Sequence, residues 1–318
     1  MRLIVMGTGP FAVPMFEAIL AAGHDVPVVV TRPTRPARGR KKPPPNPMRE
    51  AAEHLGVYVW APDSINDPEV VQQLGEVGAD LMVVCDYGQI LSLDTLATTR
   101  LGGINLHGSL LPKYRGAAPV QWAVINGDSH SGVTVIHMTP KLDGGPTLVQ
   151  VDTPIEAHET AETLEVRLSQ LGVPAVLEAI ELLASWDGKS TLGAIQDSQE
   201  VTKAPRLTKQ HGAICWSDSA LDVINRHRGV QPWPGSFTLW DRGKQPLRLL
   251  VKEMVLAEQH GSGEPGEVIA AEDERLIVAC GDGCVAFHQI QPAGKRLLTA
   301  GEFLRGYQIQ PGIRFQSS

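Results

Sequence analysis

Short apolar segments that alternate with helix-like segments constrain the fold of this chain more than any other feature. The apolar segments have the length of buried strands and occur at residues 2–7, 26–31, 57–60, 81–85, 104–107 and 133–138. Amphipathic stretches such as 47–55 and 67–77 separate them. Apolar strands joined by helices are typical of a parallel sheet covered on both faces. The sequence therefore predicts an α/β domain with a doubly wound parallel sheet, closed by a long helix within 159–186.

The pattern changes after this long helix. Residues 187–212 lack a sustained apolar period and are typical of a linker. Beyond one helix near 218–228, short strands separated by turn residues predict a small β-barrel. A chain of 318 residues has room for two domains.

Composition and charge exclude several functional classes. The chain is 42% apolar and 20% charged, which is typical of a globular protein, and its net charge of −7 argues against non-specific coating of nucleic acid. The four cysteines lack metal-site spacing, which indicates a reduced cytoplasmic protein, and Cys280-Gly-Asp-Gly-Cys284 is typical of a hairpin turn. No signal peptide or long apolar span is present, so we expect no membrane association.

Residues 31–49 form a loop rich in positive charge and proline. This segment holds seven basic residues, six prolines and no acidic residue. Proline blocks both helix and sheet, and the loop is much longer than an ordinary connection. Many such segments are simply solvated. We favour a polyanion-binding loop, because the segment follows a strand, and open α/β sheets bind ligands at the carboxyl ends of their strands.

Residues 7–12, Gly-Thr-Gly-Pro-Phe-Ala, match the G-x-G-x-x-A pattern of dinucleotide-binding sites. An NAD site requires an acidic residue after the second strand, where this chain has Thr31 and Arg32. Arg32 would suit the 2′-phosphate of NADP, so an NADP-dependent oxidoreductase stays a competing hypothesis. We favour a tight strand-to-helix turn.

Asn105, His107 and Asp143 form a candidate catalytic group. Asn105 and His107 are two residues apart at the end of an apolar run, so their side chains lie on the same face. An amide can donate to a developing oxyanion, an imidazole can exchange protons near neutral pH, and a carboxylate can accept them. This set suits acyl transfer by direct attack of a substrate amine. On spacing alone, however, polar strand ends and an Asp-Gly-Gly turn are better explained as structural.

Two longer segments carry a resemblance to a known family. INLHGSLLPKYRGAAPVQWAVINGD (104–128) and GVTVIHMTPKLDGG (132–145) resemble the formyltransferases that use 10-formyltetrahydrofolate, and more narrowly those that act on methionyl-tRNA. The resemblance covers nearly the whole chain. GTGPFAVPMFEAIL and VVCDYGQILS in the first half, and NRHRGVQPWPGSFT in the second, are similar to segments of the same family.

The resemblance implies a fold, a reaction and a set of site residues. It implies a Rossmann-like formyltransferase catalytic domain at 1–190, a linker at 191–209 and an OB-like tRNA-binding domain at 210–318. The implied reaction, in translation initiation, is formyl transfer from 10-formyltetrahydrofolate to the amino group of initiator methionyl-tRNA, by a cytoplasmic monomer without a metal. The implied catalytic residues are Asn105, His107 and Asp143. The implied folate contacts are Ser109, Leu110, Leu111, Pro112, Tyr87 and Gly88, and the implied tRNA contacts are Arg38, Arg40, Lys41 and Lys42.

The chain departs from the family pattern at four places. The family's Gly-Thr-Pro-Asp-Phe opening is changed at Gly9 and Pro10, and Gly39 stands where the family usually has an arginine in the basic loop. Asp86 replaces a small apolar residue of the pocket, and Gly144-Gly145-Pro146 replaces the family's Thr-Gly-Asp. These changes affect the expected pocket and loop contacts and leave the candidate catalytic group intact.

Two further hypotheses compete with this reading. A formyltransferase for an amino-sugar nucleotide would share the core, but a small sugar nucleotide has no need of a cationic, proline-stiffened loop. An RNA-binding protein with an inactive catalytic domain would need only the loop and the barrel. The presence of Asn105, His107 and Asp143 argues against an inactive domain.

Overall fold

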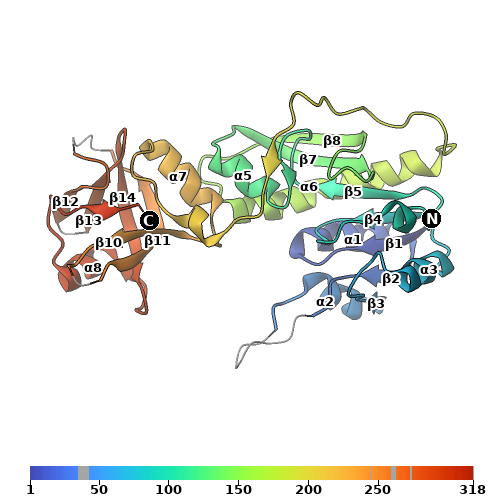
Figure 1. Cartoon of the computed structure of the whole chain (residues 1–318), viewed down its shortest axis with the longest axis horizontal. Coiled ribbons are helices and arrows are strands. Elements are labelled where there is room, and N and C mark those ends of the chain that lie inside the picture. The colour runs from blue at the N-terminus through green and yellow to red at the C-terminus, as the bar shows by residue number, and fades with distance from the viewer. Residues whose placement is uncertain (35–42, 244, 259–262, 273, 318) are drawn as a thin grey trace. The chain divides into compact units, whose positions relative to one another are not determined.

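The computed structural model describes residues 1–34, 43–243, 245–258, 263–272 and 274–317 (Figure 1). The chain divides into two compact units. The first consists of Met1–Pro119, His130–Pro154 and Leu164–Pro205, and the second of Val120–Ser129, Ile155–Thr163 and Arg206–Ser318. The last division lies within the predicted linker, but two short earlier segments of the chain also pack with the second unit.

A seven-stranded sheet with the order β3-β2-β1-β4-β5-β7-β8 forms the centre of the first unit. Its strands are β1 (Arg2–Met6), β2 (Asp25–Val30), β3 (Tyr58–Trp60), β4 (Leu81–Val84), β5 (Gly103–His107), β7 (His130–His137) and β8 (Thr147–Pro154). The strands from β3 to β5 in this order are parallel, as predicted. This arrangement places the carboxyl ends of β1, β4 and β5 at one edge of the sheet.

The direction of β7 differs from the prediction. β7 is antiparallel to β5, and β8, which the sequence did not predict, is antiparallel to β7. A buried apolar run has the same composition whichever way it runs, so its direction depends on where the preceding connection delivers the chain. β8 escaped prediction because only one of its residues is fully buried, as suits an outer strand.

The first unit contains five α-helices among its described residues. They are α1 (Val13–Ala21), α2 (Pro47–His54), α3 (Pro68–Glu76), α4 (Leu93–Leu96) and α6 (Ala161–Ala184), and a short helix, α5 (Pro119–Ile125), packs with the second unit. Of these, α2, α3 and α6 lie close to the predicted ranges 47–55, 67–77 and 159–186. Asn46 begins α2 by accepting a hydrogen bond from the Arg49 backbone N–H, and Pro47 takes the first helical position, where no N–H partner is needed. Gly172 allows α6 to approach β5 closely, because a Cβ there would lie 2.7 Å from Leu106 Cδ2.

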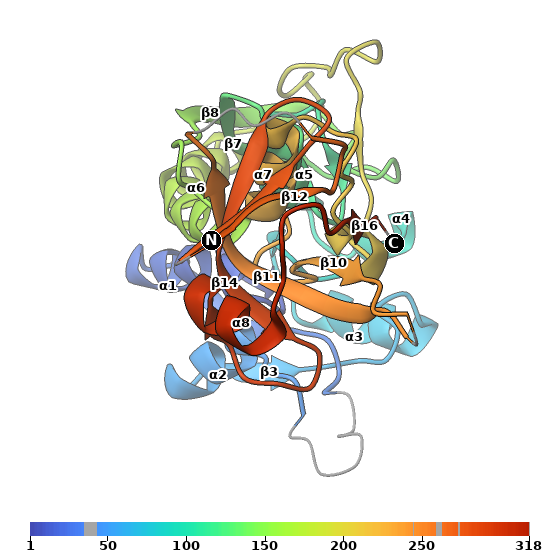
Figure 2. The ribbon, with the colours of Figure 1, turned by 90° about the vertical axis from the view of Figure 1, so that its left-hand side faces the viewer.

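The second unit is an antiparallel sheet that curls on itself. Its main strands are β10 (Ser236–Trp240), β11 (Leu247–Leu256), β12 (Val268–Glu272), β13 (Arg275–Ala279), β14 (Cys284–Pro292) and β16 (Phe315–Gln316), with the short β15 (Leu298–Thr299) beside β14. The Phe315 N–H donates to Gly266 O (2.8 Å), while Phe315 also pairs with β10. The C-terminal segment therefore meets both outer edges of the sheet, and the strands wrap around a common core (Figure 2). This is the predicted barrel-like architecture.

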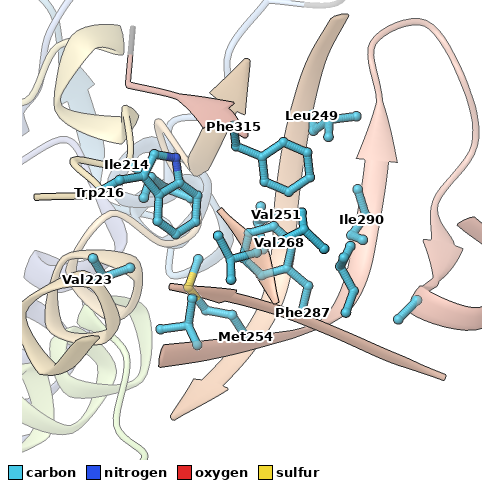
Figure 3. Packing of buried hydrophobic residues seen from close by; sticks show 14 of the residues in the cluster. Ile214, Trp216, Val223, Leu249, Val251, Met254, Val268, Phe287, Ile290 and Phe315 are labelled. Carbon is cyan, nitrogen blue, oxygen red and sulfur yellow. The ribbon is translucent and has the colours of Figure 1, made fainter. Parts of the chain in front are cut away.

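Aromatic side chains fill the barrel core (Figure 3). Phe287 and Phe315 stack with nearly parallel rings 6.2 Å apart, and Trp216 lies beside both. The indole N–H of Trp216 donates to Thr238 Oγ1 at 3.0 Å, which satisfies its one polar group inside the core. Helices α7 (Ala220–Gly229) and α8 (Ala300–Tyr307) add apolar side chains to the same cluster.

The predicted Cys280–Cys284 hairpin is confirmed. The Cys280 N–H donates to Gly283 O at 2.9 Å, the flanking strands β13 and β14 are antiparallel, and neither cysteine is in a disulfide. Within the part of the chain that the structure describes, no helix has the length and apolar character needed to cross a membrane.

Candidate active site

Asn105 and His107 lie on one face of β5, near its carboxyl end. The intervening Leu106 packs against α6, so its two neighbours point to the opposite face of the sheet. β5 is flanked by β4 and β7, and Asn105 pairs in register with Val84 at the end of β4. The alternation predicted from the sequence therefore places both side chains near the edge of the sheet where ligands bind in open α/β folds.

The His107 ring is buried and held in one orientation. Its Nε2 lies 2.9 Å from the Tyr114 carbonyl oxygen, which can only accept, so Nε2 carries a hydrogen. The other ring nitrogen, Nδ1, faces Asp143 Oδ1 at 3.9 Å, which is too long for a hydrogen bond. Nδ1 is thus the nitrogen that can exchange a proton in this site, with a carboxylate nearby to stabilise positive charge on the ring.

Asp143 reaches this position from a turn after β7. Its φ of 48° lies in the left-handed region, which few residues other than glycine adopt. Its Oδ2 accepts a hydrogen bond from the Gly116 N–H at 2.9 Å, which leaves Oδ1 directed at His107. The structure therefore brings together His107 and Asp143, two of the three residues that the sequence suggested, from separate segments.

Asn105 completes the candidate group. Its side chain is half-buried, and no hydrogen-bond partner for it is found among the described residues of the chain. An amide at a strand end that has no partner within the protein is available to a substrate.

The turn after β5 is held rigidly on β7. Thr134 Oγ1 donates to Ser109 O at 2.7 Å and accepts from the Leu111 N–H at 3.1 Å. The Ser109 hydroxyl donates to Lys113 O, and the Leu111 side chain is buried. The side chains of Ser109 and Leu111 are therefore used within the protein, whereas those of Leu110 and Pro112 are half-exposed.

Tyr87 and Gly88 lie beyond the end of β4. The Tyr87 ring packs in the apolar core beneath the sheet, and burial raises the pKa of its hydroxyl to about 12. Gly88 is exposed, and its φ is +80°. A ligand above this segment can thus contact its backbone but not the Tyr87 ring.

The predicted tRNA-contacting residues, Arg38, Arg40, Lys41 and Lys42, lie outside the described residues. The two ends of their loop are tied together, however. The Asn46 side chain bonds to Thr31 Oγ1 at 2.9 Å, and Thr31 directly follows β2. The basic loop therefore starts and ends at one point on the edge of the sheet.

The predicted linker forms part of this site. Its β9 (Lys203–Ala204) pairs in parallel with β6 (Arg115–Gly116), which follows the turn after β5. Further back along the linker, Gln196 bonds to the Asp143 and Gly145 carbonyl oxygens. The sequence contained no signal for these contacts, because a polar segment without a period resembles any exposed connection.

Both parts of the chain match formyltransferase family models, and full-length relatives share a single name. Residues 1–180 match the family model described as "Formyl transferase", and residues 206–308 match "Formyl transferase, C-terminal domain". Methionyl-tRNA formyltransferase of Rhodopirellula baltica is 49% identical over 321 residues, covering 98% of this chain and 96% of that protein. The enzyme of the same name from Geotalea uraniireducens is 42% identical, covering 98% and 97%. The chain belongs to the methionyl-tRNA formyltransferase family.

Solved structures share the fold of this methionyl-tRNA formyltransferase family member. A sugar 3N-formyltransferase, WlaRD, solved with dTDP and 5-N-formyl-THF, has a TM-score of 0.66 at 16% identity and covers 93% of this chain and 99% of its own. HypX from Aquifex aeolicus, solved with tetrahydrofolic acid, has a TM-score of 0.62 at 17% identity, and the match covers 96% of this chain and 47% of HypX. Identities this low support the shared architecture alone, so the sequence relatives decide between the tRNA and sugar enzymes.

Two departures from the family pattern occupy one place in the structure. A Cβ on residue 9 would overlap the Asp86 carboxylate in its present position, so glycine at residue 9 leaves room for Asp86 there. Asp86 itself has a φ of 47° and accepts a hydrogen bond from the Thr8 N–H at its carbonyl oxygen. A carboxylate over Gly9 disfavours a pyrophosphate at this turn, which supports the turn interpretation over the NADP hypothesis.

Among the described residues, no three His, Cys, Asp or Glu side chains gather closely enough to hold a metal ion. Burial raises the pKa of the Cys85 thiol well above its usual value, so this nearby cysteine stays neutral and is a poor nucleophile.

Proposed function

We propose that this chain transfers the formyl group of 10-formyltetrahydrofolate to the free amino group of methionine on initiator tRNA, with Asn105, His107 and Asp143 as its catalytic residues. The observation that carries the assignment is the approach of Asp143 to within 3.9 Å of His107, on the strand that also carries Asn105, whose amide has no hydrogen-bond partner among the described residues. Family membership supports the substrates, since the relatives carry the name methionyl-tRNA formyltransferase.

Each side chain has a distinct task in this proposal. The bound folate supplies the formyl group on its N10. The Asn105 amide donates a hydrogen bond to the formyl oxygen, where negative charge develops during attack by the amine. The bond between the formyl carbon and N10 then breaks, and His107 helps to deliver a proton through Nδ1 to the leaving N10, while its Nε2–H stays on the Tyr114 carbonyl. Asp143 stabilises the protonated ring and, directly or through water, accepts the proton that the attacking amine loses.

The substrates are assigned to separate surfaces. The turn at 109–112 and the segment at Tyr87-Gly88 would contact the folate, with Leu110, Pro112 and the Gly88 backbone as the accessible groups. The loop at 31–49 and the C-terminal domain at 210–318 would contact the tRNA. We place the catalytic domain at 1–190 and the linker at 191–209, and expect a cytoplasmic monomer.

One set of assays tests the proposal. We expect Asn105→Ala, His107→Ala and Asp143→Ala each to lower kcat on the order of 10²- to 10³-fold, the usual effect of losing a group that stabilises the transition state. Their melting temperatures should stay close to that of the wild type. Charged initiator tRNA should be formylated well above elongator methionyl-tRNA and amino-sugar nucleotides. Normal turnover by a folded His107→Ala variant, or preferred formylation of the sugar nucleotide, would refute the proposal.

A further inference from the structure

We propose that Gln196 and Thr202, two residues of the segment between the domains, are positioning residues that set the geometry of Asp143 and His107. This inference rests on the catalytic assignment proposed above. It extends that assignment to a part of the chain, between the two family-model matches, that the family models leave unassigned.

The need for positioning comes from the backbone. Asp143 and Tyr114 both have positive φ angles, 48° and 62° respectively, and neither is glycine. Such residues are uncommon and persist where surrounding contacts hold them. Asp143 presents its carboxylate to His107, and Tyr114 presents its carbonyl oxygen to the same ring. The two strained residues thus determine how the His107–Asp143 pair is aligned.

Gln196 holds the Asp143 turn. Its Nε2 donates to Asp143 O at 2.9 Å and to Gly145 O at 2.7 Å. Its Oε1 accepts from the guanidinium of Arg115, at 2.6 Å from Nη2 and 3.1 Å from Nε. One amide therefore joins two carbonyl oxygens on one side to a largely buried cation on the other. A carboxylate of the same shape could keep the bonds to Arg115 but could not donate to the carbonyls.

Thr202 holds Tyr114 in a similar way. Its Oγ1 accepts a hydrogen bond from the Tyr114 N–H at 2.8 Å, and its carbonyl oxygen accepts from the Arg115 N–H at 2.9 Å. The carbonyl of Tyr114 then accepts the bond from His107 Nε2. Thr202 therefore acts on His107 through one intervening residue, as Gln196 acts directly on the backbone of Asp143.

The segment that carries Gln196 and Thr202 is anchored to the first compact unit on both sides of Gln196. Ala194 exchanges two backbone hydrogen bonds with Thr147, each of 2.8 Å, before Gln196, and β9 pairs with β6 after it. Both anchors lie within the first compact unit. Gln196 is consequently fixed on both sides, and its amide cannot follow Asp143 if the turn relaxes.

Substitutions of Gln196 test whether it positions the proposed catalytic residues. Gln196→Met keeps the length of the side chain and removes all four hydrogen bonds, and Gln196→Glu keeps those to Arg115 alone. Both should lower kcat on the order of 10- to 100-fold, as expected when a catalytic group is misplaced by about 1 Å. KM for methionyl-tRNA and for the folate should change less than about twofold, because both variants keep every group that touches a substrate. Gln199→Ala, in the same segment with an exposed side chain, is the matched control and should behave as the wild type.

A double-mutant cycle distinguishes positioning from a general structural role. If Gln196 acts through Asp143, Gln196→Met should have almost no effect on the residual kcat of an Asp143→Ala enzyme. Thr202→Val should likewise lower kcat in the wild type but not in a His107→Ala enzyme. Equal losses in both backgrounds, or wild-type kcat in Gln196→Met and Gln196→Glu, would overturn the inference. Full turnover by Asp143→Ala alone would instead remove the catalytic assignment on which it rests.

Discussion

His227 is a buried histidine on α7 whose protonation should govern the acid stability of the barrel domain. It is 7% exposed, and its Nδ1 bonds to Ser236 Oγ at 3.0 Å. Burial, with the charge of Lys252 as a smaller cause, lowers its pKa from 6.5 to about 4. The unfolded chain therefore binds a proton between these pH values that the folded chain does not.

The lowered pKa of His227 should make the folded chain less stable in acid. Because the folded pKa is lowered, the stabilising contribution of neutral His227 is fully present above about pH 6.5 and is lost as the pH falls toward about 4. The loss should amount to about 3 kcal/mol of unfolding free energy. Urea unfolding of the wild type and of His227→Asn, which keeps a polar partner for Ser236, measures it across this range. The variant should lose less stability on acidification, whereas the exposed-site control His158→Asn should follow the wild type. Parallel curves for the wild type and His227→Asn would contradict this assignment.

The pairing of β6 with β9 joins the linker to the proposed catalytic residues, and one glycine permits it. Gly116 has a φ of +132°, and a Cβ there would lie 2.5 Å from Ala204 O. Gly116→Ala should force these strands apart and withdraw the N–H that Asp143 Oδ2 accepts. We expect kcat to fall on the order of 10-fold or more, since Asp143 would lose its alignment.

Gly188→Ala provides the matched comparison for this glycine. Gly188 also has a positive φ, +75°, but nothing lies within 4 Å of the position of its Cβ. The substitution should cost about 1–2 kcal/mol in local backbone energy and leave kcat unchanged. Steady-state kinetics of both variants decide the point. If both lost activity alike, backbone strain rather than contact with Ala204 would be the cause.

Over the molecule as a whole, charge sets how a tRNA can be bound. The net charge of −7 opposes general attraction to a polyanion, so the seven basic residues of the 31–49 loop should dominate binding. Replacing Arg38, Arg40, Lys41 and Lys42 with alanine should weaken tRNA binding and flatten its salt dependence. The slope of log K for binding against log salt concentration should become shallower by roughly 0.7–0.9 for each phosphate that the loop no longer neutralises. Folate binding should persist, because the folate segments lie elsewhere in the chain.

Single variants and a salt series complete this test. Glycine at position 39 suggests that a neighbouring arginine replaces the usual one, so Arg38→Ala and Arg40→Ala should differ in formylation of the charged tRNA. Undiminished formylation by the quadruple variant at every salt concentration would show a solvated charge run, and specificity would then lie in the barrel domain.

Local patterns in the sequence determined most elements and part of the site. The parallel strands, the start of α2 at Asn46-Pro47 and the Cys280–Cys284 hairpin all depend on residues within a few positions of one another. The same holds for Asn105 and His107, whose common face follows from the two-residue period of a strand. Asp143 was grouped with them by its carboxylate and its Asp-Gly-Gly turn, and the family resemblance implied a catalytic role for all three.

Only the tertiary structure decided how distant segments meet. It showed that β7 is antiparallel to β5 and that β8 is a further strand of the sheet. It also showed that the Tyr87 ring lies in the core and that the Asp86 carboxylate lies over Gly9. It also brought Gln196 to Arg115, 81 residues earlier, and to Asp143, 53 residues earlier. Contacts of this kind join groups whose sequence separation is arbitrary, so they leave no period or turn signal in the chain. The sequence by itself determined which groups are candidates for the chemistry, and the packing of a polar linker against Asp143 and Arg115 decided how two of the site's segments are held.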